Sequence, residues 1–424
     1  MAGPLPPDLL PDNSRIDDAG RLSIGGCDVL ELAAEYGTPL FVYDEDHLRA
    51  RCREAVEAFG DRAVYATKAF LCTAMARLAH EEGMRLDVAT GGELFVARRA
   101  GVPADRLVMH GNNKSIAELA EALDAGVGRI VIDSFEEIDR IESLVADGHP
   151  IPRVHVRITP GVEAHTHEFV RTGQDDSKFG FGVRSGDAKR AVRRVADSPA
   201  FDLLGLHCHI GSQVFRVESY TEAMEVVAEF AAPFDLPELS VGGGLGVAYV
   251  DGEESATIAA WAGVIHRAAA ANGLDAELWA EPGRAIAAAA AVTLYTVGTI
   301  KDIPGVRTYV AVDGGMSDNP RPVLYGSGYE SFLPRDVRAE RERVVRLVGK
   351  HCESGDVLID AAPLPADLEV GDVVATPVTG AYGLSMGSNY NKIRRPAAVF
   401  VRDGEARLVV RRETYEDLVA CDVD

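Results

Sequence analysis

Short apolar segments recur along the first two thirds of the chain, and most show little alternation between apolar and polar positions. They are rich in Val, Ile, Leu and Ala, a composition typical of strands that are buried on both faces of a parallel sheet. The pattern predicts eight such strands, at 62–66, 85–89, 107–110, 129–133, 153–158, 203–209, 239–241 and 277–280.

Between these strands, apolar residues recur at helical spacing in segments such as 72–82, 93–100, 115–125, 134–146 and 220–230. Several of these segments open on Ser or Asp and close on Gly, as helices do. Eight strand–helix units in sequence predict an α/β fold, a (β/α)8 TIM-type barrel over residues 44–287. A doubly wound open sheet is the alternative, and the number of units favours the barrel.

Beyond residue 287 the pattern predicts strands at 291–300, 307–312, 343–348, 373–378, 397–401 and 406–411, and in several of them apolar and polar positions alternate with period two. These form a C-terminal, mostly antiparallel β domain over 288–424. Segments 21–24 and 40–43 also have the pattern of strands. We expect the N-terminal segment 1–43 to pack with the β domain, because the barrel is already full. The long segment 159–181 predicts a lid or ligand loop.

Composition narrows the class of protein. A chain of 424 residues is too long for one ordinary core, and 47% hydrophobic with 26% charged residues is typical of a globular protein. No apolar run could span a bilayer and the first residues do not resemble a signal peptide, so we expect a cytoplasmic protein. The net charge of -23 argues against nucleic acid or an anionic membrane as partner. The six cysteines show no metal or disulfide spacing, so we expect free thiols and no metal.

Candidate chemistry gathers where the predicted barrel strands end, which is where TIM barrels place their active sites. Lys68 ends the first strand and His209 the sixth, while a glycine-rich run, 242–246, follows the seventh and segment 281–284 the eighth. This set offers an amine, a flat ring, a backbone cradle for a phosphate and a carboxylate. These are the parts that hold pyridoxal phosphate and let it accept electrons.

Further polar residues extend this site. Ser212 is a second phosphate donor, and Glu281 is placed to pair with a pyridine nitrogen. Arg binds carboxylates through two bonds, so Arg284 and the 318–326 segment are candidates for substrate contacts. Each feature alone also fits a structural role, such as a plain glycine turn or a core histidine, and only their combination favours a cofactor site.

The second domain adds a thiol beside carboxylates in Cys352-Glu353-Ser354-Gly355-Asp356. A cysteine can donate a proton and a glutamate can receive a substrate amine. The alternative is a polar turn with a structural cysteine.

At this point the chain resembles the diaminopimelate decarboxylase family of pyridoxal-phosphate enzymes, which has the alanine-racemase-like fold. The resemblance covers nearly the whole chain. It is carried by Tyr65-Ala66-Thr67-Lys68-Ala69, His207-Cys208-His209-Ile210-Gly211-Ser212-Gln213, Gly242-Gly243-Gly244-Leu245-Gly246, Glu281-Pro282-Gly283-Arg284, Cys352-Glu353-Ser354-Gly355-Asp356, Gly380-Ala381-Tyr382 and Ser388-Asn389-Tyr390-Asn391.

The resemblance implies roles for individual residues. Lys68 would bind the cofactor covalently, His209 would stack on its ring, and Cys352 or Lys68 would return the proton. The residues implied in catalysis are Lys68, Cys352, His209 and Glu281. Those implied in cofactor binding are Lys68, His209, Ser212, Gly243, Gly244, Glu281, Gly283, Arg284 and Tyr382. Those implied in substrate binding are Arg284, Arg321, Tyr325, Glu353 and Tyr382.

It also implies a head-to-tail homodimer with shared active sites, in which the Cys352 loop reaches the partner's barrel. The expected reaction removes the carboxylate at the D-centre of meso-2,6-diaminopimelate to give L-lysine and CO2, the last step of lysine biosynthesis. D-ornithine, D-lysine or carboxynorspermidine would be the substrate of a rival decarboxylase. A racemase is disfavoured by Glu281, and a catalytically inactive binding protein by the intact Lys68, Cys352 and Glu353.

Overall fold

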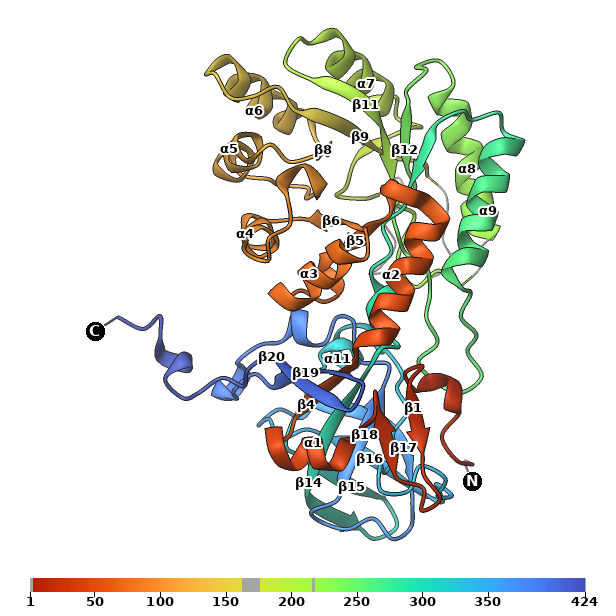
Figure 1. The fold of residues 1–424 in the computed structure, drawn as a ribbon, viewed down its shortest axis with the longest axis vertical. Coiled ribbons are helices and arrows are strands. Elements are labelled where there is room, and N and C mark those ends of the chain that lie inside the picture. The colour runs from red at the N-terminus through yellow and green to blue at the C-terminus, as the bar shows by residue number, and fades with distance from the viewer. Residues whose placement is uncertain (1–2, 162–175, 216–217, 424) are drawn as a thin grey trace. The chain divides into compact units, whose positions relative to one another are not determined.

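The computed structural model describes residues 3–161, 176–215 and 218–423 (Figure 1). The chain divides into two compact units. Residues Arg51–Val247 and Ser255–Ala285 form one, here called the barrel unit. Residues Met1–Ala50, Ala248–Glu254 and Ile286–Asp424 form the other, here called the sheet unit.

The barrel unit is built on eight parallel strands that neighbour one another in chain order. A parallel bridge between Ala63 and Ala280 joins the first strand to the last and closes the barrel. The closed ring confirms the predicted TIM-type barrel and excludes the open sheet. The strands are β5 Val64–Ala66, β6 Arg85–Val88, β7 Leu107–Met109, β8 Arg129–Ile132, β9 Arg153–Thr159, β11 Asp202–Cys208, β12 Glu238–Ser240 and β13 Glu277–Trp279.

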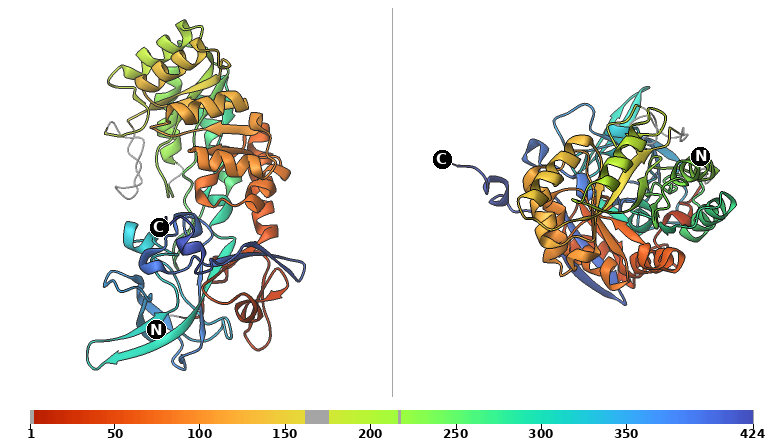
Figure 2. Two further views of the ribbon diagram at one scale, coloured as in Figure 1. Left: turned by 90° about the vertical axis from the view of Figure 1, so that its left-hand side faces the viewer. Right: turned by 90° about the horizontal axis from the view of Figure 1, so that it is seen from above.

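Helices lie on the outside of these strands (Figure 2). Their ends follow from local sequence: Ser115 and Glu118 form a capping box at the start of α5, and Gly126 in the left-handed conformation ends it. The helices are α2 Glu45–Phe59, α3 Thr73–Glu81, α4 Gly91–Arg99, α5 Ile116–Ala125, α6 Phe135–Ala146, α7 Asp187–Asp197, α8 Glu218–Ala231 and α9 Ile258–Ala271.

The interior of the barrel is packed rather than open. Val64, Val108, Val131 and Trp279 form one buried cluster. Nearby, the Glu238 carboxylate accepts hydrogen bonds from Arg129 at 2.5 and 2.8 Å and contacts His155 at 2.6 Å. Burial opposes ionisation of Glu238, but these cationic and imidazole partners outweigh it and lower its pKa to about 2. The charges of Arg129 and Glu238 are therefore paired with each other inside the barrel.

The sheet unit contains an eight-stranded sheet in which five strand pairs are antiparallel and two, β15–β16 and β4–β19, are parallel. This matches the predicted mostly antiparallel domain, with one further strand, β17, that the pattern did not predict. The strands are β4 Leu40–Asp44, β14 Ala291–Ile303, β15 Arg307–Val312, β16 Arg343–Val348, β17 Val357–Leu364, β18 Val373–Pro377, β19 Ala397–Arg402 and β20 Glu405–Val410.

Both N-terminal strands predicted at 21–24 and 40–43 are present and lie in the sheet unit. The first, β2, Leu22–Ile24, pairs with β1, Ser14–Ile16, and β3, Cys27–Asp28, in a small sheet of its own. One expectation needs correction. The predicted loop 159–181 is shorter, because Thr159 belongs to β9 and pairs in parallel with β10, Phe181–Gly182. Its residues 162–175, which carry the predicted lid, lie outside the described part of the chain.

Two features of composition have structural counterparts. All six cysteines are free thiols, as expected. Among the described residues, no helix is both long and apolar enough to cross a membrane.

Candidate active site

Lys68 lies directly after β5, in a single 3-10 turn, Thr67–Ala69. The Thr67 hydroxyl donates to the main-chain oxygen of Asp87 at 2.6 Å and ties this turn to the neighbouring strand. The Lys68 side chain is exposed. The positive charge of Lys68 acts to lower the pKa values of Asp87, Glu93 and His209. The amine therefore lies near these residues, at this rim of the barrel.

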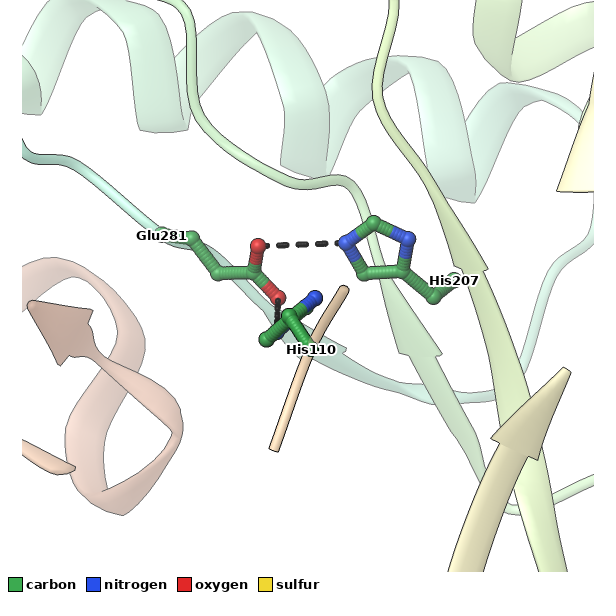
Figure 3. A group of neighbouring side chains, drawn as sticks. All are labelled: His110, His207 and Glu281. Carbon is green, nitrogen blue, oxygen red and sulfur yellow. Dashed lines mark hydrogen bonds and ion pairs between the residues drawn. The ribbon is translucent and has the colours of Figure 1, made fainter. Parts of the chain in front are cut away.

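Glu281, at the end of β13, is buried among hydrogen-bond donors (Figure 3). The Ser240 hydroxyl donates to one carboxylate oxygen at 2.8 Å, and His207 Nε2 contacts the other at 3.1 Å. His110 Nε2 lies 3.5 Å from the first oxygen, and the two imidazoles meet edge to face with centroids 5.0 Å apart. His110 also lies 4.0 Å from Asp87. The His110 ring therefore lies between two carboxyl groups, those of Glu281 and Asp87.

Burial and charge divide these groups into different protonation states. Burial opposes ionisation of Glu281, but His207 and His110 outweigh it and hold the pKa well below its usual value. Burial raises the pKa of Asp87 despite His110 and Lys68. Burial lowers the pKa of His207 to about 4, whereas Asp87 and Glu281 raise the pKa of His110 against burial. Glu281 is therefore the carboxylate that stays ionised here.

His207, His110 and Glu281 offer ligand-type atoms that all lie within 4.8 Å of one another, a spacing that a metal ion would accept. The hydrogen bonds from Ser240 and His207 hold the Glu281 carboxylate in one orientation and leave each oxygen able to accept a further bond.

His209 follows β11 and is oriented by the glycine-rich run. Its Nδ1 accepts a hydrogen bond from the Gly243 main-chain N–H at 3.1 Å, so the ring proton lies on Nε2. Burial, with the positive charges of Lys68 and Arg157, lowers the pKa of His209 well below its usual value. The ring is therefore neutral and held in one orientation, which suits stacking on a flat ligand.

The glycine-rich run approaches the main chain of its neighbours too closely for any side chain. A β-carbon at Gly243 would lie 2.2 Å from the Glu281 main-chain oxygen, and one at Gly244, where φ is +102°, would lie 2.0 Å from that of Gly211. Gly283 is equally confined by Ala66, at 2.9 Å. Buried Arg284 donates to the Ser212 hydroxyl at 2.9 Å. Arg284 and Ser212, next to this run without side chains, offer a place for an anion.

The remaining predicted residues belong to the sheet unit. Arg321 opens a short helix, α11 Arg321–Tyr325. Its guanidinium is buried, lies 4.1 Å from the ring centre of Tyr249, and donates to the Tyr329 hydroxyl at 2.5 Å. No carboxylate of the described residues forms an ion pair with Arg321, and its Nε has no hydrogen-bond partner there. Tyr325 is half-buried at the end of the helix.

Cys352 and Glu353 are exposed on the loop between β16 and β17. Tyr382 is half-buried with a φ of +60°, a left-handed conformation that is rare for an aromatic residue. Such conformations persist where surrounding structure requires them, often at functional sites.

Sequence reasoning missed several polar residues at the barrel rim. Asp87, His110, Asp133, Arg157 and His207 all lie at or beside strand ends, and Arg157 contacts Asp133 at 3.4 Å. These residues could have been found by the sequence feature that identified Lys68, a polar residue at the end of an apolar strand. His207 was quoted within its motif without a role.

Comparison with known proteins agrees with this geometry. Residues 45–288 match the family model of the pyridoxal-dependent decarboxylase, pyridoxal binding domain. Over 99% of the chain and 98% of the relative, the sequence is 47% identical to diaminopimelate decarboxylase of Mycobacterium tuberculosis. The corresponding Bacillus subtilis protein is 48% identical, with 98% of each chain covered. The chain belongs to the diaminopimelate decarboxylase family.

Solved structures of the diaminopimelate decarboxylase family share the whole fold. The enzyme from M. jannaschii, in co-complex with L-lysine, has a TM-score of 0.90 and 33% identity, covering 97% of this chain and 98% of the other. The Helicobacter pylori enzyme, complexed with L-lysine, has a TM-score of 0.84 and 32% identity over 93% and 98%.

The residues present fit the cofactor of the diaminopimelate decarboxylase family, pyridoxal phosphate. The barrel unit supplies an amine at Lys68, a neutral ring at His209 and an ionised carboxylate at Glu281. The Arg284–Ser212 pair offers donors to a phosphate, and the glycine-rich run beside it has no side chains to fill the space. Glu281 forms no ion pair with a lysine or arginine of the described residues, and an ionised, buried carboxylate of this kind is the group that a protonated pyridine nitrogen requires.

Proposed function

We propose that the protein decarboxylates meso-2,6-diaminopimelate at its D-centre and releases L-lysine and CO2, with pyridoxal phosphate as cofactor. The observation that carries the reaction type is the ionised, buried Glu281 carboxylate. Bound pyridoxal phosphate supplies a sink for the electron pair left when the Cα–carboxylate bond breaks. A carboxylate that keeps the pyridine nitrogen protonated strengthens that sink.

The chain's own residues divide the remaining work. Lys68 would hold the cofactor covalently through its amine, where the substrate amine would exchange with it. His209 would lie against the flat face of the ring, with its orientation fixed by the Gly243 N–H. Glu281 would hold the proton at the pyridine nitrogen, and Arg284 with Ser212 would bind the phosphate. Cys352 or Lys68 returns a proton to Cα.

The choice of substrate rests on Arg321 and Glu353, which would bind the end of the substrate that lies away from the reacting carbon. Arg321 is buried with tyrosines around it and carries no acidic partner among the described residues, as a cation reserved for a substrate carboxylate would. Glu353 offers a carboxylate for the distal amine. D-ornithine and D-lysine lack the second amino-acid end that this pair would bind. The names of the relatives and the L-lysine in two solved structures point the same way.

The test is release of CO2 from the purified protein with meso-diaminopimelate, D-ornithine, D-lysine and carboxynorspermidine in parallel. We expect kcat/KM to be highest for meso-diaminopimelate by at least a factor of about a hundred, because the rivals leave Arg321 unpaired. A higher value with any rival substrate would assign the enzyme to that substrate. A colourless protein that gains no absorbance with pyridoxal phosphate would reject the reaction type.

We further propose a homodimer in which the loop with Cys352 completes the partner's site. Exposure of Cys352 and Glu353 on a single chain is consistent with this role. Co-expression of Lys68→Ala with Cys352→Ala chains tests it, because a mixed dimer holds one site with both groups and one with neither. Random pairing makes about half of the dimers mixed, so activity should return to about a quarter of wild type. Mixed dimers without recovered activity would place Cys352 in its own chain's site.

A further inference from the structure

The loop that carries Cys352 and Glu353 is held from within by Asp356. This carboxylate is buried and accepts three hydrogen bonds from its own chain. The main-chain N–H of Met316 donates to Oδ1 at 2.7 Å. The main-chain N–H of His351 and its ring Nδ1 both lie against Oδ2, at 2.9 and 2.7 Å. One side chain thus joins both ends of the loop to a second segment, around residues 314–316.

His351 completes this arrangement. Its ring is buried and stacks on Tyr390, with centroids 5.7 Å apart and planes 6° from parallel. Asp356 accepts at Nδ1, so that ring position carries the proton. Nε2 is buried and has no hydrogen-bond partner among the described residues. Among the described residues, the imidazole therefore makes one hydrogen bond, from Nδ1 to the Asp356 carboxylate.

Glycines on both segments make room for the carboxylate. A β-carbon at Gly349 would lie 2.1 Å from Asp356 Oδ2, and one at Gly315 would lie 2.6 Å from both oxygens. The two segments also bond directly, because the Lys350 N–H donates to the Gly314 oxygen at 3.0 Å. Outside the loop, the exposed Asn391 accepts from the Cys352 N–H at 2.9 Å. The main chain at Cys352 is thus fixed from two sides.

We propose that His351 and Asp356 are positioning residues for catalysis, acting through Cys352 and Glu353. They hold the main chain of this exposed turn so that the thiol and the carboxylate reach the reacting atoms in one orientation. Without the hydrogen bonds to Asp356, the turn would sample many conformations. A displacement of a reacting group by about 1 Å lowers the rate by about a hundredfold. The inference rests on the proposed function of the two exposed residues.

A pair of substitutions at His351 provides the test. In His351→Asn the amide nitrogen occupies the place of Nδ1 and can still donate to Asp356. In His351→Gln the amide lies farther out, near the place of Nε2, and the donor is lost. We expect His351→Gln to lower kcat/KM about tenfold, the usual effect of losing a bond to a charged group. His351→Asn should stay within about twofold of wild type, and cofactor absorbance should be unchanged in both.

Two further measurements separate positioning from a general loss of structure. Hydrogen exchange at 314–317 and 349–356 should quicken about tenfold in His351→Gln and not in His351→Asn. In a Cys352→Ala, Glu353→Gln background, His351→Gln should cause no further loss, because residues that act through one another are not additive. If His351→Gln folds poorly, the exposed Asn391→Gly provides a milder loss of about threefold.

The outcomes distinguish the two levels of inference. If Cys352→Ala and Glu353→Gln lose activity while His351→Gln keeps wild-type kcat/KM and exchange, positioning is rejected and the proposed function stands. If Cys352→Ala and Glu353→Gln keep wild-type kcat/KM, the roles proposed for these two residues fall together with the positioning proposal, whatever the exchange data show. A loss in His351→Gln that persists in the doubly substituted background would also reject positioning through these residues.

Discussion

The barrel unit and the sheet unit each bury a carboxyl group, and the two groups have opposite properties. Glu281 in the barrel and Asp318 in the sheet unit each accept a hydroxyl bond at 2.8 Å, from Ser240 and Tyr295. Glu281 also faces two imidazoles, and its pKa is lowered. Asp318 faces a Gly315 amide and lies near other carboxylates, and burial with those charges raises its pKa to about 7.

Burial alone does not decide whether a carboxyl group is charged. Burial raises the pKa in both places, and the neighbours determine whether that effect prevails. In the barrel the neighbours stabilise the anion, which can then hold a proton on a bound ligand. In the sheet unit, burial and the charges of Asp356 and Asp313 outweigh the bonds from Tyr295 and Gly315, so Asp318 holds a proton up to about pH 7 and serves the structure. The following predictions test this division between a chemical and a structural cluster.

The largest effect is expected at the barrel rim. Lys68→Ala should abolish turnover, because alanine has no amine with which to bind the cofactor covalently and release the product. Steady-state CO2 release, with the cofactor absorbance recorded, measures both losses. The exposed Lys189→Ala on α7 is the matched control and should match wild type. Wild-type kcat in Lys68→Ala would remove this lysine from the mechanism.

Asp318→Asn should change the pH dependence of stability. The folded pKa of Asp318, about 7, lies above its unfolded value, so the folded protein binds the proton more tightly. The resulting stabilisation is complete below pH 4 and is lost as pH rises through 7, about 4 kcal/mol in all. The asparagine variant does not titrate. Between pH 5 and 8, the wild-type melting temperature should fall relative to the variant by roughly 6–10 °C.

The exposed Asp422→Asn is the control for this titration and should follow wild type at every pH. Parallel melting curves for wild type and Asp318→Asn would show that Asp318 titrates normally. The contrast between the two units would then rest on Glu281 alone.

Glu281→Gln tests the other half of the contrast. Glutamine keeps an acceptor for Ser240 and removes the charge, so the pyridine nitrogen loses its counterion. We expect kcat to fall at least about a hundredfold, the size of effect seen when one preorganised electrostatic group is removed from an active site. Exposed Glu277→Gln, on the same strand, should have no effect. Equal rates in Glu281→Gln and wild type would mean that the buried charge serves folding rather than chemistry.

Much of the fold could be predicted from sequence because the apolar runs of the barrel strands are continuous and separated by capped helices. Strand β17 was missed because its burial does not alternate cleanly: Asp360 and Ala361 are exposed in its middle. The separate small sheet of β1, β2 and β3 depends on pairing among two- and three-residue strands, which no periodicity can reveal.

The site was partly predictable for a similar reason. Residues in local motifs, such as Lys68 and Glu281, could be located at strand ends. The imidazoles around Glu281 could not, because His110 and His207 come from strands far apart in the chain and meet only in the closed barrel. The protonation states could not be predicted either, since they depend on this three-dimensional set of neighbours.

The smallest expected effect concerns the sheet unit's contribution to substrate binding. Arg321→Ala should lower kcat/KM for meso-diaminopimelate about tenfold or more, because a charge-assisted contact contributes about 1.5–3 kcal/mol. The cofactor absorbance should stay, since Arg321 is assigned to substrate and not to cofactor. Arg307→Ala, an exposed arginine of the same unit, is the control.

Arg321→Lys should recover only part of the loss, because a lysine cannot form the paired bonds of a guanidinium with a carboxylate. Tyr329→Phe removes the 2.5 Å bond that orients the guanidinium and should give a smaller loss in the same direction. If Arg321→Ala lowers the melting temperature and leaves kcat/KM unchanged, this buried cation is structural like Asp318, and the sheet unit does not choose the substrate through it.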